Sequence, residues 1–146
     1  MAFINQTIHT AMKKVIINTA RTEKGYSGNC DLLSGWIVAC SGSFSEFRKE
    51  VEESIQFYLY CSKEDGVPYP PIFDEDYEIE YKFDVQSLLL FYQGIFSYSA
   101  LENITGINQK QLSHYAAGRS KPRKTQSEKI AKGLKVLAEE MMSITV

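Results

Sequence analysis

The sequence predicts an α+β fold in which a small β-β-β-α-β domain, residues 1–84, precedes an all-helical domain, residues 85–146. Three patterns support this prediction. Short apolar runs in the first forty residues are typical of buried strands. Apolar side chains then recur at helical spacing for about four turns. A final alternating stretch gives way to helical spacing for the rest of the chain, which indicates a change from a mixed domain to a helical one.

The first three strands are predicted to form an antiparallel meander. The β-branched run at residues 15–17 fits a buried strand, and RTEKG at residues 21–25 is a hairpin turn signal. The returning strand covers residues 26–31, and a second turn follows at residues 32–35. The third strand, WIVAC at residues 36–40, is apolar on both faces, so we expect it to be central in the sheet.

One helix and one strand complete the first domain. Ser43 and Glu46 have the spacing of a capping box at the start of the helix. The face expected to dock on the sheet comprises Phe47, Val51, Ile55, Tyr58 and Leu59. Gly66 ends the helix, and three prolines hold the following connection extended. From Tyr77 to Asp84 apolar and mostly acidic residues alternate, which predicts a strand with one face on the core.

The second domain is predicted to contain a helix-turn-helix. After a helix that includes residues 88–92, a short helix covers residues 100–105. Gly106 permits the positive backbone angle of a tight turn, and Asn108 is a natural N-cap for the next helix. That helix is anchored inward by Leu112 and Tyr115 and is ended by Gly118. A last helix begins near Thr125.

Charge is distributed unevenly along the chain. The net charge is −2, but residues 107–146 hold eight Lys or Arg and three Glu, whereas residues 1–106 hold eight cations and fifteen acids. A basic C-terminal half suggests a polyanion as its partner, and an acidic N-terminal half suggests a cationic protein. Uneven but merely solvated surfaces are the alternative.

Polar side chains beside cations are what a helix-turn-helix needs in order to bind a major groove. The residues expected to reach base edges are Gln109, Lys110, Ser113 and His114. Those expected to hold phosphates are Tyr98, Asn108, Arg119, Lys121, Arg123 and Lys124. The alternative is a plain helical hairpin with a solvated polar face, on which His114 would be an ordinary solvated histidine.

The last helix carries an apolar stripe made of Ile130, Leu134, Leu137 and Met141, spaced by four, three and four residues. Such a stripe belongs either to the core of the same small domain or to the seam of a homodimer or higher homo-oligomer.

Composition favours a reduced, cytoplasmic protein without catalytic chemistry. Cys30, Cys40 and Cys61 are widely spaced and form no metal-binding pattern. The N-terminus lacks a signal peptide, and no apolar stretch is long enough to span a membrane. His9 and His114 lie in different halves, and no phosphate loop or nucleophile elbow occurs. We therefore expect no enzyme activity, no metal and no cofactor.

Three segments resemble a known family. The runs KGYSGNCDLLSGW and SGSFSEFRKEVEESIQFYLYCSKEDGVPYPP look like the N-terminal domain of HicB-type antitoxins, and INQKQLSHYAAGRSKPRK resembles the Cro-like helix-turn-helix that many of these antitoxins carry. The likeness covers most of residues 14–140. Its N-terminal features are Tyr26, Gly35, Ser43 with Glu46, and Asp65-Gly66-Val67-Pro68. The loop Cys30–Trp36 departs from the family's P-D-L-P-G-C pattern.

The resemblance implies that the first half is a partial, catalytically inert RNase H-like domain that binds and blocks a HicA-type, mRNA-cleaving toxin. It implies that the second half is a dimeric DNA-binding domain that represses the pair's own operon. An acidic domain suits a basic RNA-cleaving partner, and residues 41–86 hold twelve acids against four bases.

Two other functions stay open at this stage. A one-component regulator whose first domain senses a small molecule would need an apolar pocket and no protein partner. A nuclease would need several carboxylates converging on one point. Asp31, at a strand end, is the one acid whose position suggests membership of such a cluster.

Overall fold

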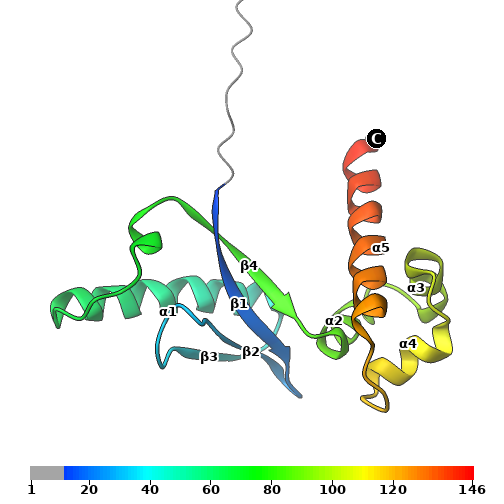
Figure 1. The fold of residues 1–146 in the computed structure, drawn as a ribbon, viewed down its shortest axis with the longest axis horizontal. Helices are drawn as coiled ribbons and strands as arrows, with labels where there is room; N and C mark the ends of the chain where they lie inside the picture. Colours follow the sequence, from blue (N-terminus) through cyan, green and yellow to red (C-terminus); the bar gives the residue numbers. More distant parts are fainter. Residues whose placement is uncertain (1–11) are drawn as a thin grey trace, which may run out of the picture.

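The computed structural model describes residues 12–146, so the start of the predicted first domain, including His9, lies outside the described residues. The fold is α+β, with one sheet followed by a group of helices (Figure 1). The elements, in chain order, are β1 (Lys13–Arg21), β2 (Gly25–Asn29), β3 (Ile37–Ser41), α1 (Phe44–Glu64), the short 3-10 helix η1 (Pro71–Asp74), β4 (Tyr77–Phe83), α2 (Val85–Tyr92), α3 (Tyr98–Thr105), α4 (Gln109–Ala116) and α5 (Lys124–Ser143).

The sheet has four strands in the order β3-β2-β1-β4. The first three form the predicted antiparallel meander, with Asn18 of β1 opposite Asn29 of β2 and Gly28 of β2 opposite Val38 of β3. Strand β4 pairs parallel to β1, as α1 provides the long connection that a parallel neighbour requires. The alternation predicted for β4 is confirmed, because its residues are alternately half-buried and exposed along the strand.

The expectation that the third strand is central was wrong, because β3 lies at an edge of the sheet. The other side of β1 is taken by β4, so the meander leaves β3 without a second neighbour. Within β3, Val38 is buried in the core and Cys40 is half-buried against it, whereas Ile37 is 74% exposed. Trp36 is buried from the preceding loop, where its indole Nε1 donates to Ser54 Oγ at 2.9 Å.

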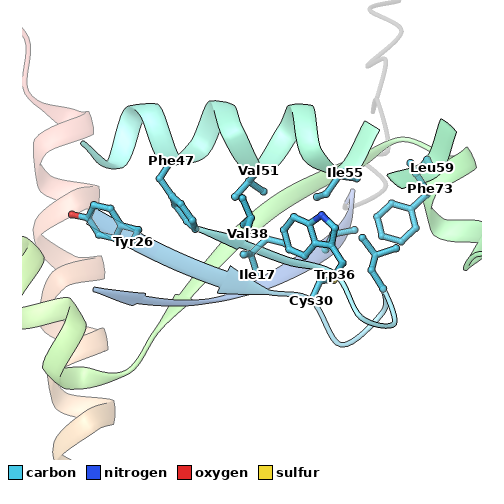
Figure 2. Packing of buried hydrophobic residues seen from close by; sticks show 12 residues of the cluster. Ile17, Tyr26, Cys30, Trp36, Val38, Phe47, Val51, Ile55, Leu59 and Phe73 are labelled. Carbon is cyan, nitrogen blue, oxygen red and sulfur yellow. The ribbon is translucent and has the colours of Figure 1, made fainter. Parts of the chain in front are cut away.

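Helix α1 covers one face of the sheet with the predicted apolar stripe (Figure 2). Phe47, Val51 and Ile55 are fully buried, and Figure 2 shows them pointing from α1 toward the strands. Burying a side chain of this size contributes roughly 1.5–3 kcal/mol. The predicted capping box starts the helix: Glu46 N donates to Ser43 Oγ at 3.2 Å, and Ser43 N donates to Glu46 Oε2 at 2.7 Å. Because the Glu46 carboxylate accepts a hydrogen bond from the backbone N–H of Ser43, its charged form is stabilised and its pKa is lowered.

The connection between α1 and β4 differs from the extended segment that its prolines suggested. Pro71 begins one turn of 3-10 helix, because the fixed φ of proline suits the first helical position and its missing N–H costs nothing there. This turn buries Phe73 in the core, where its ring lies 5.4 Å from that of Tyr77 in an edge-on arrangement.

The helices α2 to α5 enclose a second core made of Leu89, Leu101, Ile107, Leu112, Tyr115, Ala116 and Ile130. The apolar stripe of α5 is only partly used by this core. Ile130 is buried and Leu134 packs against the cluster, but Leu137 is half-buried and Met141 is 62% exposed. Figure 1 shows the C-terminal turns of α5 extending beyond α3.

The sheet and the helices meet through α2. Asp84, the predicted boundary residue, caps α2 by accepting from Ser87 N at 2.7 Å. Ser87 is buried, and its Oγ accepts from Arg21 N at the end of β1 at 3.0 Å. Gln86 Nε2 donates to the carbonyl of Ala116 at 3.4 Å. The first turn of α2 therefore contacts both the sheet and the end of α4.

Gly133 generates a prediction about the second core. A Cβ at this position would lie 2.3 Å from the backbone oxygen of Ile104, so Gly133→Ala must push α5 away from α3. We expect a loss of about 1–3 kcal/mol in the free energy of unfolding, although alanine is the better helix former. Urea denaturation measures it. Gly94→Ala is the matched control, because nothing lies within 4 Å of a Cβ there. Equal stability of the two variants would contradict the close contact.

Candidate nucleic-acid interface

The turn between α3 and α4 is held by local hydrogen bonds and one buried side chain. Gly106 has a φ of 74°, in the left-handed region that the sequence predicted. Thr105 Oγ1 donates to the carbonyl of Leu101 at 2.7 Å and accepts from Ile107 N at 3.2 Å. Ile107 is buried, so the residue after the turn is part of the core. This arrangement fixes where α4 starts.

Helix α4 exposes one side and buries the other. Asn108 is the predicted N-cap, and its Oδ1 accepts from Lys110 N at 2.9 Å. The inward anchors Leu112 and Tyr115 are buried as expected, together with Ala116. Of the four residues predicted to reach base edges, Gln109 and Lys110 are exposed, and Ser113 and His114 are half-buried. All four thus lie on a short helix whose opposite side is anchored in a core.

The loop after α4 folds back against that helix. Gly118 has a φ of 72°, and Arg119 N donates to the carbonyl of His114 at 3.0 Å. Gln111 Nε2 donates to Ser120 Oγ at 3.1 Å, which ties the loop to the side of α4. In the sequence, Gln111 is one polar residue among several on this helix. Its role in positioning the loop could not be deduced without the loop's path.

Cations gather on this loop without acidic partners. Arg119, Lys121 and Arg123 are exposed, as is Lys110 on α4. Within residues 12–146, these four side chains form no ion pair, whereas Lys124 lies 4.0 Å from Glu128. Unpaired cations beside a polar helix face are available to phosphate groups. We call α4 together with residues 117–124 the basic surface.

Two residues predicted to contact phosphates also have structural roles. Tyr98 is the first residue of α3 and packs, half-buried, against the second core. The side-chain oxygen of Asn108 is engaged in capping α4. Its amide nitrogen, like the Tyr98 hydroxyl, is a donor that could still meet a phosphate.

Over residues 12–146, no group of three or more His, Cys, Asp or Glu side chains is placed to hold a metal ion. Asp31 is the acid that the nuclease hypothesis singled out. Its Oδ1 accepts from Asn18 Nδ2 at 3.2 Å, and the same amide nitrogen donates to Asn29 Oδ1 at 3.1 Å. Burial raises the pKa of the Cys30 thiol, which disfavours the reactive thiolate. The three cysteines are free thiols.

The open hollows on the surface of residues 12–146 include two that are lined by residues of the sheet end and of the basic surface. One, of about 370 Å³, runs over the ends of β1, β2 and β4 on the side of the sheet away from α1, and its lining includes Asn18 and Lys82. The other, of about 580 Å³, lies at the junction of the two halves, between the start of α2 and the basic loop, with Gln86, Tyr115 and Lys121 in its lining.

Compared with models of known protein families, with curated proteins and with solved structures, the chain has no match. Among the helices of residues 12–146, none combines the length and the apolar character needed to cross a lipid bilayer.

Proposed function

We propose that this chain is an antitoxin and autorepressor. In this proposal the helical half binds operator DNA, and the acidic half binds and neutralises a small, basic, mRNA-cleaving toxin of the HicA type. The observation that carries the proposal is the basic surface, where α4 and its loop hold five cations and no acid in a chain of net charge −2. The HicB-like sequence runs favour this pairing of functions.

The DNA-binding role is supported by how α4 is mounted. The helix is short, capped, and anchored by Leu112 and Tyr115, so its exposed side is held rigidly. Lys110 and Gln109, in its first turn, have the donors that major-groove edges accept. Arg119, Lys121 and Arg123 lie on the adjoining loop and would contact the phosphate backbone. These assignments make α4 the helix that enters the groove.

The toxin-binding role is supported by the first half. Its β-β-β-α-β order agrees with the partial RNase H-like domain that the resemblance implies. It carries most of the chain's acids, and opposite charge speeds the encounter of two proteins.

Paired substitutions test the DNA assignments. Gln109→Ala should cost roughly 1–3 kcal/mol of binding free energy on the specific operator and relax specificity, because a base contact is lost.

Arg123→Ala should weaken binding to specific and random DNA alike and flatten the dependence of log K on log salt by about one unit. Fluorescence anisotropy titrations at several salt concentrations measure both effects. Equal losses on operator and random DNA for Gln109→Ala, or an unchanged slope for Arg123→Ala, would remove that residue from its role.

Co-expression tests the function as a whole. This protein, tagged, is produced together with the small basic protein encoded beside it. We expect a stable complex, and we expect the small protein alone to cleave mRNA and stop growth. Recovery of this protein alone, still bound to DNA, would overturn the antitoxin proposal.

Repression through a two-fold-symmetric operator requires a dimer. We place the dimer contact on the exposed end of the α5 stripe, around Leu137 and Met141. Light scattering should then give the mass of two chains, and Met141→Glu should give that of one. Lys135→Glu, on the exposed side away from the stripe, is the control and should leave the dimer intact. A wild-type protein that stays a single chain when bound to DNA would contradict this contact.

A ligand-sensing regulator is the second candidate. The hollow of about 580 Å³ at the junction favours it, because a small molecule bound there would touch both Gln86 and Lys121 of the basic loop. Its lining combines apolar side chains such as Phe83 and Val85 with a few polar and charged ones, which is the composition usual for a small-molecule site. If the co-expression experiment recovers this protein without a protein partner and it still binds DNA, that result would favour the ligand-sensing regulator.

A further inference from the structure

Helix α1 carries a second feature besides its buried stripe. Phe57 and Tyr60 are 68% and 61% exposed, although both lie well inside a 21-residue helix. Their neighbours on the same side are acidic and exposed. We define the acidic–aromatic face by Glu50, Glu53, Phe57, Tyr60 and Glu64.

The spacing of these residues places them on one line along α1. Successive members are three or four residues apart, which is the spacing of neighbours on a helix surface. The buried stripe of Phe47, Val51 and Ile55 lies on the opposite side, so the sheet cannot cover this face. The exposure of both aromatic rings therefore follows from the way α1 docks.

The charge of this face limits the partners that fit it. Glu50, Glu53 and Glu64 hold three negative charges, and Lys49, at its margin, lies 3.8 Å from Glu53. Nucleic acid would be repelled by these carboxylates. Glu46 is not available, because its carboxylate is engaged in the capping box.

A basic protein surface is complementary to this face. An arginine guanidinium can pair with a carboxylate through two parallel hydrogen bonds and can also stack on an aromatic ring. Two adjacent rings flanked by carboxylates offer both contacts along the same helix. Buried aromatic anchors surrounded by polar groups are the usual centre of a protein–protein interface.

We propose that the acidic–aromatic face of α1 is the surface that binds the basic toxin, with Phe57 and Tyr60 as central anchors. This inference rests on the proposed antitoxin function and adds to it the surface and the chemistry of the contact. The carboxylates speed association, whereas the two aromatic side chains slow dissociation.

The test compares variants of the full-length protein with the small basic protein encoded beside it, using surface plasmon resonance. Phe57→Ala combined with Tyr60→Ala should raise Kd by roughly 30-fold or more, mainly through faster dissociation. Glu50→Gln combined with Glu53→Gln should slow association and flatten its salt dependence. Ile37→Ala is the matched control, since Ile37 is equally exposed but lies on β3.

The outcomes separate this inference from the proposed function. Loss of binding by the aromatic variant alone, with DNA binding unchanged as the check on folding, supports the acidic–aromatic face. Unchanged binding by the aromatic variant would overturn it, and a loss with Ile37→Ala instead would move the contact to the sheet. If the wild-type protein does not bind the small basic protein at all, the proposed function fails and the inference fails with it.

Discussion

The packing of α1 on the sheet is the interaction on which the first half depends. Phe47, Val51 and Ile55 are fully buried against β1, β2 and β3, and this contact decides which side of the helix and which side of the sheet stay in water. The acidic–aromatic face exists because the apolar stripe is turned inward. The long helix also provides the crossover that lets β4 lie parallel to β1. One apolar contact thus sets both the topology and the surface available to a partner.

The second half depends on a similar but smaller contact. Leu112 and Tyr115 hold α4 in a core that Leu101, Ile107 and Ile130 complete, and the polar side of α4 is displayed as a result. The two halves of the chain carry opposite net charge, so the kinds of partner that their electrostatics favour differ. Their connection through Ser87 and Gln86 joins the end of β1 to the end of α4, so the first turn of α2 links the sheet to the basic surface.

Local signals predicted most of the elements. The capping box of α1, the alternation in β4, the left-handed Gly106 and the N-cap Asn108 all rest on contacts within a few residues, and all were confirmed. The candidate DNA-binding residues follow from the same local pattern, and their contacts with DNA stay a prediction. Contacts between distant segments were harder to foresee. The tie between Gln111 and Ser120 depends on the path of a loop, and the exposure of Phe57 depends on the docking of a helix.

The sequence by itself determined the type and order of most helices and strands, the capped starts of α1 and α4, and how charge divides between the two halves, because caps, turn glycines and periodicity act over short range. Only the tertiary structure decided the order of the strands. The apolar run at residues 36–40 suggested a central strand, but β4 took the free side of β1 and left β3 at the edge. The physical reason is that pairing between strands is set by long-range competition for edges, which the composition of a single strand does not record.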